Sequence, residues 1–371
     1  MSHKIFSRVL IAMNDDFEKV HEFKFHWLNQ NGQPTSMFRK KGNIEGETIT
    51  LEKSEIPIAA IFQTLIRDKS MVITIATVDP ANPYSSLLLQ LPSVKAANEL
   101  KTSIDIIRSA IWAKQHREDL QKKGMGHTFR AGQCPHCDAV LILSDMPETP
   151  QLYCHFCDSL STVDPTLEPI RQEKDLRICE ECGMYSKPQK FTIFYFYFLL
   201  VVYGFWQKST WRCPPCMRGE AWKMVFGNLL FVLGFPWAVY QLFRSYGGAS
   251  VGGVYRGLDT GNLRARKGNL TGALENYREI LSKVPVSAGV KYNLGIALLG
   301  QNNPRQAAES FELALADCSN YAPAYGQLTA LYDQLGETEK RKALQAMWES
   351  EEVENTPEAE AVSSGIVENI E

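Results

Sequence analysis

The sequence has little surplus charge of either sign. It contains 39 Lys and Arg against 42 Asp and Glu, so the formal net charge is −3 over 371 residues. A nucleic-acid binder that depends on phosphate contacts carries a basic surplus, so this class is not expected. The hydrophobic share of 44% and the charged share of 22% are those of a folded chain, which excludes disorder throughout.

The sequence also lacks the motifs of several common reactions. It has no Gly-rich phosphate loop, no His-Glu-x-x-His helix and no set of kinase motifs. The segment Met1–Leu10 has no apolar core followed by a cleavage site, so no secretory signal peptide is expected. These absences favour a binding or anchoring protein over an enzyme.

Cysteine is missing from the first 133 residues and then becomes the most informative residue. Of the nine cysteines, eight form four Cys-x-x-Cys pairs. In a chain that is not secreted, such pairs indicate metal ligation in a reducing compartment and argue against a disulfide framework. The ninth, Cys318, is expected to be an ordinary buried thiol.

The first two pairs, Cys134/Cys137 and Cys154/Cys157, are separated by sixteen residues. Two such turns on adjacent hairpins are typical of zinc knuckles that bind one Zn²⁺ through four thiolates at ~2.3 Å. The sequence therefore predicts a structural zinc ribbon. Three neighbouring histidines are expected to lie around this site without binding the metal: His127, His136 and His155.

Cys134-Pro-His-Cys137 also resembles the motif of strongly oxidising disulfide-exchange proteins, in which a thiolate of low pKa reacts. That chemistry requires a helix directly after the second cysteine, whereas the residues from Asp138 onward have the pattern of a strand. A thiol-disulfide oxidoreductase that uses Cys134 and Cys137 remains one alternative. A zinc-ribbon nucleic-acid binder is the other.

The second two pairs, Cys179/Cys182 and Cys213/Cys216, are thirty residues apart and enclose the uncharged run 191–206. A second uncharged run, 224–243, has twenty residues and is long enough to span a ~30 Å hydrocarbon layer. Tyr, Trp and Lys at the ends of both runs suit the membrane interface. We expect two membrane helices here, of which the shorter either spans or is re-entrant.

Metal binding and membrane topology constrain each other in this region. If the four cysteines share one zinc, both ends of 191–206 lie on the same side of the membrane; if that run spans, the pairs cannot meet. The order of pair, apolar insert and pair is similar to the LITAF-like domain, whose zinc-pinned apolar segment anchors a protein to one leaflet. This resemblance implies a second zinc ion. Four basic residues favour a position that is cytoplasmic or faces anionic lipid: Lys208, Arg212, Arg218 and Lys223.

The N-terminal third contains short apolar or β-branched runs, followed by a helical pattern from Ala97 to Ile111 with Ser93 as the expected N-cap. Thr48–Ile61 has the pattern of two strands joined by a turn. Several strands followed by one closing helix resemble a pleckstrin-homology-like domain. Another small α+β domain is an equal alternative.

The C-terminal third is repetitive. Residues Gly257–Pro285 and Lys291–Ser319 align at an offset of 34 residues, the period of tetratricopeptide repeats, and a degraded third copy begins at Tyr321. Small residues such as Gly261 and Ala273 allow two helices to approach closely, and the aromatic Tyr277 fills the space to the next pair. The resemblance implies a concave groove that binds a protein or peptide, for which the expected partner-binding residues are Asn262, Arg266 and Asn293.

The sequence thus predicts a multidomain α+β protein. Its expected parts are a small β-rich domain with a closing helix (1–123), a zinc ribbon (124–175), a zinc-knuckle pair with two membrane-associated segments (176–246), a flexible linker (247–257), a tetratricopeptide solenoid (258–348) and an acidic disordered tail (349–371). The expected function is that of a membrane-anchored adaptor with two zinc ions. Its partners would be a protein and membrane lipid, with the zinc sites and repeats facing the cytoplasm.

Overall fold

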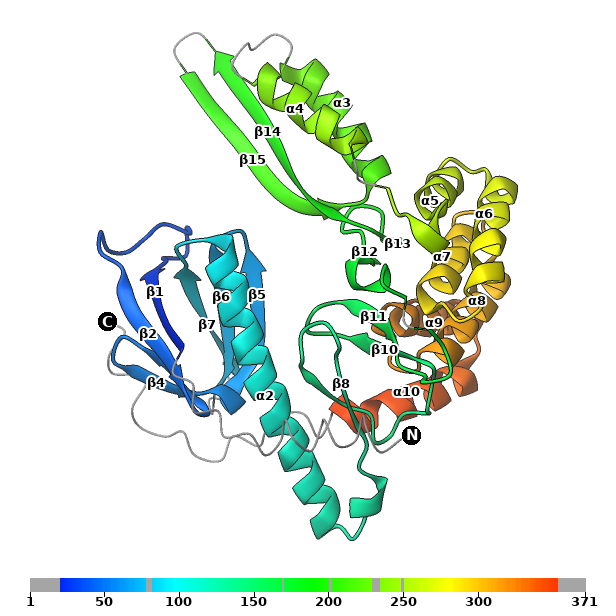
Figure 1. Cartoon of the computed structure of the whole chain (residues 1–371), viewed down its shortest axis with the longest axis horizontal. Helices are drawn as coiled ribbons and strands as arrows, with labels where there is room; N and C mark the ends of the chain where they lie inside the picture. Colours follow the sequence, from blue (N-terminus) through cyan, green and yellow to red (C-terminus); the bar gives the residue numbers. More distant parts are fainter. Residues whose placement is uncertain are drawn as a thin grey trace. The chain divides into compact units, whose positions relative to one another are not determined.

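The computed structural model describes residues 21–77, 82–168, 170–199, 202–228, 234–247 and 250–352 (Figure 1). Contacts divide the chain into two compact units. One runs to Asp145 and includes the chain from Met347 onward, and the other is Met146–Ala346. An antiparallel sheet precedes a helical C-terminal part, so the expected mixed α+β class is confirmed at this level.

The first unit contains a seven-stranded antiparallel sheet in the order β4-β3-β2-β1-β7-β6-β5. Its strands are β1 (His21–Trp27), β2 (Lys40–Glu45), β3 (Thr48–Leu51), β4 (Ser54–Pro57), β5 (Ile61–Arg67), β6 (Ser70–Ala76) and β7 (Tyr84–Gln90). In β6, Met71, Ile73 and Ile75 are buried and alternate with less buried residues, as expected for a sheet with one face on a core. The expected pair of strands within Thr48–Ile61 corresponds to β3 and β4.

Helix α2 (Val94–Lys122) closes this core. It begins where the sequence predicted, because Ser93 Oγ accepts a hydrogen bond from the backbone N–H of Ala96 at 3.1 Å. The predicted apolar positions from Ala97 to Ile111 are buried against the sheet. Asp105 and Arg108 form a buried ion pair at 2.8 Å, and Arg108 also donates to the carbonyl of Phe62 at 2.7 Å, which joins the helix to β5.

Four two-stranded hairpins follow α2 along the chain. The three short ones pair β8 (Ala131–Gln133) with β9 (Val140–Ile142), β10 (Gln151–Cys154) with β11 (Ser159–Thr162), and β12 (Arg177–Ile178) with β13 (Tyr185–Ser186). The fourth is long and pairs β14 (Gln189–Leu199) with β15 (Val202–Arg212) in an unbroken register from Gln189↔Arg212 to Leu199↔Val202. The prediction of a helix over 191–206 is therefore wrong.

The second uncharged run, 224–243, falls into two helices, α3 (Pro214–Asn228) and α4 (Phe235–Tyr246); residues 229–233 lie outside the described part. Both helices lie beside the long hairpin (Figure 1). Phe191 and Ile193 of β14 form a small core with Met217, Met224 and Ala238 of the helices. None of the helices in the described ranges is both long and apolar enough to cross a bilayer, so the expected spanning helices are not found there.

The chain then enters a helical array within the second unit. Its helices are α5 (Leu258–Arg266), α6 (Leu270–Lys283), α7 (Ala288–Leu299), α8 (Pro304–Asp317), α9 (Ala322–Leu335) and α10 (Thr338–Glu352). Gly261 lies against Tyr277, and Gly295 against Phe311, so closely that a Cβ would come within 2.9 and 2.5 Å of the respective ring. The small residues thus allow the close helix approach that the sequence predicted.

The two segments that flank this array, the predicted linker and the predicted tail, differ from expectation in the part that the structure describes. In the predicted linker 247–257, Tyr255 is fully buried and its Oη lies 3.3 Å from Ser287 Oγ, so this part of the linker is packed. The predicted disordered tail begins inside α10, which extends to Glu352; the residues from 353 onward lie outside the described part.

Candidate metal centres

Three of the four Cys-x-x-Cys pairs end in the same tight turn. The residue that follows the second cysteine has a positive φ: 61° at Asp138, 56° at Asp158 and 66° at Gly183. This left-handed conformation is readily adopted by Gly and tolerated by Asp. It reverses the chain after the second cysteine, so that both sulfur atoms of a pair point to the same side.

Backbone hydrogen bonds close these turns in the same way. The N–H of Cys134 donates to the carbonyl of Ala139 at 2.9 Å, and the N–H of Cys179 donates to that of Met184 at 3.0 Å. In both turns the residue after the second cysteine donates back to the first cysteine's carbonyl, at 3.0 Å for Asp138 and 2.9 Å for Gly183. These turns have the form expected of zinc knuckles.

The first group consists of the four sulfur atoms of Cys134, Cys137, Cys154 and Cys157, which lie within 4.8 Å of one another. Cys134 and Cys154 are buried, whereas Cys137 and Cys157 are half-buried. After Cys137 the chain makes a turn and enters strand β9. The sequence predicted a strand at this position, whereas the oxidoreductase alternative requires a helix. The arrangement is that of a four-cysteine metal site and lacks the helix that the oxidoreductase alternative requires.

The second group consists of Cys179, Cys182, Cys213 and Cys216, again within 4.8 Å. Cys179 and Cys182 lie in the turn between β12 and β13, whereas Cys213 follows β15 and Cys216 lies in the first turn of α3. The antiparallel register of the long hairpin returns the chain to Arg212, beside Gln189, which brings the second pair to the first. The thirty intervening residues therefore separate the pairs along the chain but not in space.

The geometry of the second group fits zinc. The Sγ atoms of Cys182 and Cys213 are 3.7 Å apart, and a tetrahedron with Zn–S bonds of ~2.3 Å has edges of about 3.8 Å. The N–H of Cys213 donates to Cys179 Sγ at 3.2 Å, a contact that stabilises a thiolate. Two groups of four thiols are thus compatible with two zinc ions.

The thiols of the second group alter one another's proton affinity. Hydrogen bonds from Cys182, Cys213 and Cys216 lower the pKa of Cys179, whereas hydrogen bonds with Cys179, Cys182 and Cys216 raise the pKa of Cys213. The pKa of Cys182 is lowered as well, and that of Cys216 is raised, so the first pair favours thiolates while Cys213 and Cys216 keep their protons. Zinc binding must displace those protons, so its affinity falls as the pH falls.

Arg266 of α5 reaches the second group. Its Nη1 atom donates to Cys216 Sγ at 2.8 Å. Partial burial acts to lower the pKa of Arg266, but the nearby cysteines outweigh burial and raise it. Four thiolates around Zn²⁺ leave two negative charges, and a guanidinium beside one sulfur offsets part of them. Arg266, which the sequence predicts to bind a partner, instead contacts the second cysteine group of its own chain.

The other two expected partner-binding residues also contact their own chain. Asn293 accepts the backbone N–H of Tyr185 at 2.6 Å through Oδ1 and donates to the carbonyl of Tyr185 at 2.7 Å through Nδ2. Asn262 Nδ2 donates to the same carbonyl at 3.0 Å, and Tyr277 Oη donates to Asn262 Oδ1 at 2.9 Å. Both asparagines are buried, so strand β13 fills the position that we expected a partner to occupy.

A third asparagine, Asn320, contacts a strand as Asn293 does, through both the N–H and the carbonyl of one residue. Asn320 accepts the N–H of Tyr153 at 2.9 Å and donates to its carbonyl at 2.8 Å, and Tyr153 directly precedes Cys154. Gln151 of the same strand accepts the N–H of Ala288 at 2.8 Å. The array thus grips one strand beside each cysteine group, a role that sequence reasoning missed because no local pattern marks these pairs.

A buried carboxylate connects the same strands to the array. Glu173 accepts hydrogen bonds from Gln151 Nε2 at 2.9 Å, from the Thr162 N–H at 2.8 Å and from Tyr255 Oη at 3.3 Å. Burial raises the pKa of Glu173, although these hydrogen bonds oppose the effect. Glu173 therefore links β10, β11 and the segment that leads into α5.

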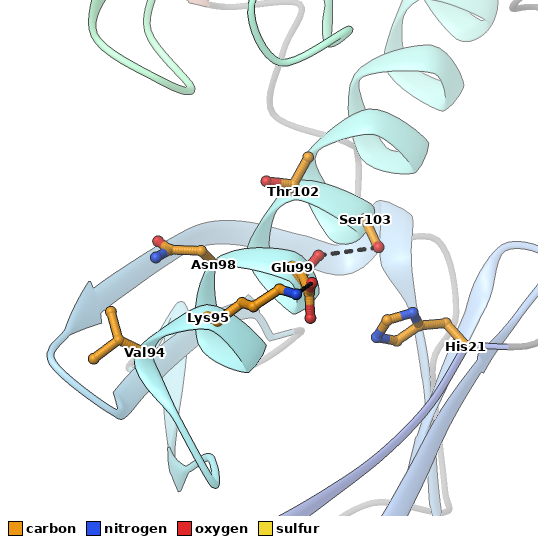
Figure 2. Close-up of a pocket in the computed structure, with 7 residues that line it drawn as sticks. All are labelled: His21, Val94, Lys95, Asn98, Glu99, Thr102 and Ser103. Atoms are coloured by element: carbon orange, nitrogen blue, oxygen red, sulfur yellow. Dashed lines mark hydrogen bonds and ion pairs between the residues drawn. The ribbon is translucent and has the colours of Figure 1, made fainter. Parts of the chain in front are cut away.

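A surface hollow in the first unit has no such chemistry. It is formed by the first turns of α2 beside His21 (Figure 2). Lys95 and Glu99 form an exposed ion pair at 3.6 Å, and Ser103 Oγ donates to the backbone carbonyl of Glu99 at 3.0 Å. Among its lining residues no nucleophile is paired with a base, so the hollow suggests no reaction.

The two cysteine groups are therefore the strongest candidate functional features of the chain. A comparison with models of known protein families finds no match to this chain, and a search of proteins of curated function finds none either.

Proposed function

We propose that this chain is a non-enzymatic adaptor at a membrane, stabilised by two zinc ions, whose helical array binds a protein partner. The observation that carries the proposal is the gathering of eight cysteines into two groups of four sulfur atoms, each within 4.8 Å. Four thiolates around one zinc leave no open position for a substrate, which is typical of structural and not of catalytic zinc.

The helical array supports the adaptor part of the proposal. A 34-residue offset relates helix pair α5–α6 to α7–α8, with Gly261 and Tyr277 in the first pair and Gly295 and Phe311 in the second. These features favour the resemblance to tetratricopeptide repeats. The side chains of Asn293 and Asn320 already hydrogen-bond to strands β13 and β10. We therefore expect a partner to bind other surfaces of the array or to replace one of these strands.

Charge argues against the nucleic-acid alternative. Residues 124–175, which contain the first cysteine group, carry eight Asp and Glu but only three Lys and Arg. Such a ribbon repels phosphate, and nucleic-acid affinity depends mainly on cationic contacts with phosphate. Thiolate ligation also favours a reducing compartment, in agreement with zinc sites and repeats on the cytoplasmic side.

A metal count on the purified full-length chain tests the zinc part. We expect two zinc ions per chain, one fewer after Cys134→Ser and one fewer after Cys213→Ser. Cys318→Ser is the matched control, because Cys318 lies outside both groups, and it should retain two ions. One zinc in the unaltered chain, together with reductase activity that Cys134→Ser abolishes, would instead support the oxidoreductase.

Capture from an extract of the native cell tests the adaptor part. The full chain should retain a protein, and the same chain with a disrupted array, Tyr277→Ala, should not. If the chain held two zinc ions but captured no protein, the adaptor part of the proposal would be wrong. The array would then serve only to hold the strands beside the cysteine groups.

A further inference from the structure

Helix α4 exposes aromatic side chains on the face that points away from its core. Its fully buried residues are Ala238, Gln241 and Ser245, and its partly buried Phe235, Val239 and Leu242 pack against the core formed with β14 and α3. Its exposed side chains are aromatic: Trp237, Tyr240, Phe243 and Tyr246, of which Phe243 is 73% exposed. A helix at a protein–water surface carries polar residues on the face opposite its apolar stripe, so the exposed aromatic residues depart from the usual pattern.

Helix α3 extends this surface. Trp222 and Phe226 are exposed, and their rings stack with centroids 5.8 Å apart. Trp222 Nε1 donates to Tyr246 Oη at 3.4 Å, which joins the exposed aromatic rings of the two helices. We call these six residues the aromatic face: Trp222, Phe226, Trp237, Tyr240, Phe243 and Tyr246. In the described part of the chain they form an exposed cluster that needs an explanation.

The segment that carries the aromatic face is rich in basic residues, although Lys187 and Arg212 pair with Asp175 and Glu181. Residues 183–246 carry seven Lys and Arg and a single acidic residue, Glu220, in a chain whose net charge is −3. The guanidinium of Arg218 lies over the ring of Tyr246, 4.8 Å from its centre. The side chain of Lys223 is 72% exposed and lies 3.5 Å from Glu220. The surface thus combines apolar rings, polar Tyr and Trp tips, and cations.

We propose that the aromatic face lies in the headgroup region of an anionic lipid bilayer, with α3 and α4 in the plane of the membrane. This inference rests on the proposed membrane function and names the surface and the lipid class. Trp and Tyr favour the membrane interface because their rings enter the acyl boundary while their polar tips stay hydrated. Lys and Arg beside the rings are attracted to anionic headgroups.

A second copy of the chain suits this surface less well. A twofold dimer through the aromatic face would bring identical surfaces together and place Arg218 and Lys223 near their own symmetry mates. Such like-charge contacts oppose association. An anionic bilayer instead supplies the opposite charge together with the apolar layer.

Flotation of the full chain with vesicles tests the proposal. The chain should float with mixed phosphatidylcholine–phosphatidylserine vesicles and bind phosphatidylcholine vesicles more weakly. The double variant Tyr240→Ser/Phe243→Ser should lose at least about tenfold in partitioning, because inserting each ring contributes roughly an order of magnitude. Lys223→Glu should reduce the preference for phosphatidylserine.

The matched control is Phe38→Ser, which removes a ring that is 77% exposed in the first unit. It should float as the unaltered chain does. Zinc content and circular dichroism must be unchanged in the double variant; if they are not, Lys223→Glu and its loss of anionic preference decide the test.

The possible failures separate the inference from the proposed function. If the unaltered chain floats and the folded double variant floats equally well, the aromatic face is wrong but membrane association stands. If the unaltered chain binds neither vesicle, lipid docking is wrong, and the zinc count and partner capture still test the adaptor. A dimer that dissociates in the double variant would overturn the lipid proposal in favour of a second copy.

Discussion

Helices α6 and α4 belong to the same unit and both carry aromatic residues, but on opposite sides. In α6 the aromatic residue Tyr277 is 1% exposed and packs in the array with Ala273 and Ile280. In α4 most aromatic residues point outward, and the buried positions hold Ala238, Gln241 and Ser245. Because Phe235, Val239 and Leu242 of α4 pack against the core, the difference lies in the outer face, which carries further aromatic residues in α4.

The two helical regions share one fixed point, the second cysteine group. Helix α3, which packs against α4, directly follows Cys213 and carries Cys216 in its first turn. Arg266 at the end of α5 donates to Cys216 Sγ at 2.8 Å. Loss of the metal should therefore affect both regions, whereas changes within one region should leave the other unaltered. The following predictions test this separation.

The largest effect is expected for Cys213→Ser. It removes a ligand of the second metal, and structural zinc contributes on the order of 10 kcal/mol of apparent binding free energy to folding. Hydrogen exchange should lose its protection in both α3 and α5. Cys134→Ser, which removes a ligand of the first group, is the comparison and should leave exchange in α3 and α5 unchanged. If α3 and α5 kept their protection after Cys213→Ser, their stability would not depend on the second metal.

The next effect is that of Tyr277→Ala. Truncation of a fully buried aromatic side chain should lower the free energy of unfolding by about 3–5 kcal/mol and release the helical array. Chemical denaturation followed by circular dichroism measures the loss. Near-unchanged stability would show that α6 does not depend on its inward ring.

A smaller effect is expected for Asn293→Ala. It removes both hydrogen bonds of Asn293 to the backbone of Tyr185. The carbonyl keeps Asn262 as a donor, but the buried N–H loses its acceptor, at a cost of about 2 kcal/mol. Asn276→Ala is the matched control, because Asn276 accepts only from the half-buried Arg264 Nη1 at 3.0 Å. Thermal unfolding should distinguish them. Equal shifts of the unfolding temperature in the two variants would show that Asn293 does not stabilise the contact between the array and β13.

The buried Glu173 predicts a dependence on pH. Because burial raises its folded-state pKa above the ordinary 4.5, the folded state favours the protonated form. This contribution is complete below pH 4.5 and is lost as the pH rises through the folded pKa. Unfolding free energies should therefore decline with pH in this window, and Glu173→Gln should flatten the decline. The comparison holds over the range in which both zinc ions remain bound; an identical slope in the variant would contradict it.

The smallest effect on stability is expected for Phe243→Ala, the outward counterpart of Tyr277→Ala. Because Phe243 is 73% exposed, the free energy of unfolding should change by less than about 0.5 kcal/mol. The same denaturation experiment measures it. A loss as large as that of Tyr277→Ala would show that the aromatic face is part of a core, and would remove the difference between the two helices.

The sequence predicted the features that repeat or that depend on fixed spacing. Cys-x-x-Cys pairs place two thiols on one turn wherever they occur, so both cysteine groups could be expected. The offset of 34 residues predicted that small residues such as Gly261 and Gly295 allow close helix approach. It did not predict that Tyr277 and Phe311 fill these positions from within the same helix pair. The helical pattern after Ser93 likewise predicted α2, because a cap and a 3.6-residue period are local signals.

The long hairpin was mistaken for a helix because hydropathy alone does not distinguish the two. Its strands are rich in Phe, Tyr, Ile, Thr and Val, the aromatic and β-branched residues that favour strands, and this signal was available. The contacts of Asn293 with Tyr185 and of Asn320 with Tyr153 were not available. Each joins positions more than a hundred residues apart, and a buried asparagine has no sequence pattern of its own.

The register of β14 and β15 makes the distance between the second two cysteine pairs adjustable. Gln189 pairs with Arg212 next to Cys213, so the metal group depends only on the root of the hairpin. Two residues removed from each strand would preserve which side chains share a face and would shorten the hairpin by about 7 Å. Related chains can therefore keep the same four-cysteine group with a very different number of residues between the pairs. A sequence pattern for such chains should leave the spacing between Cys182 and Cys213 open.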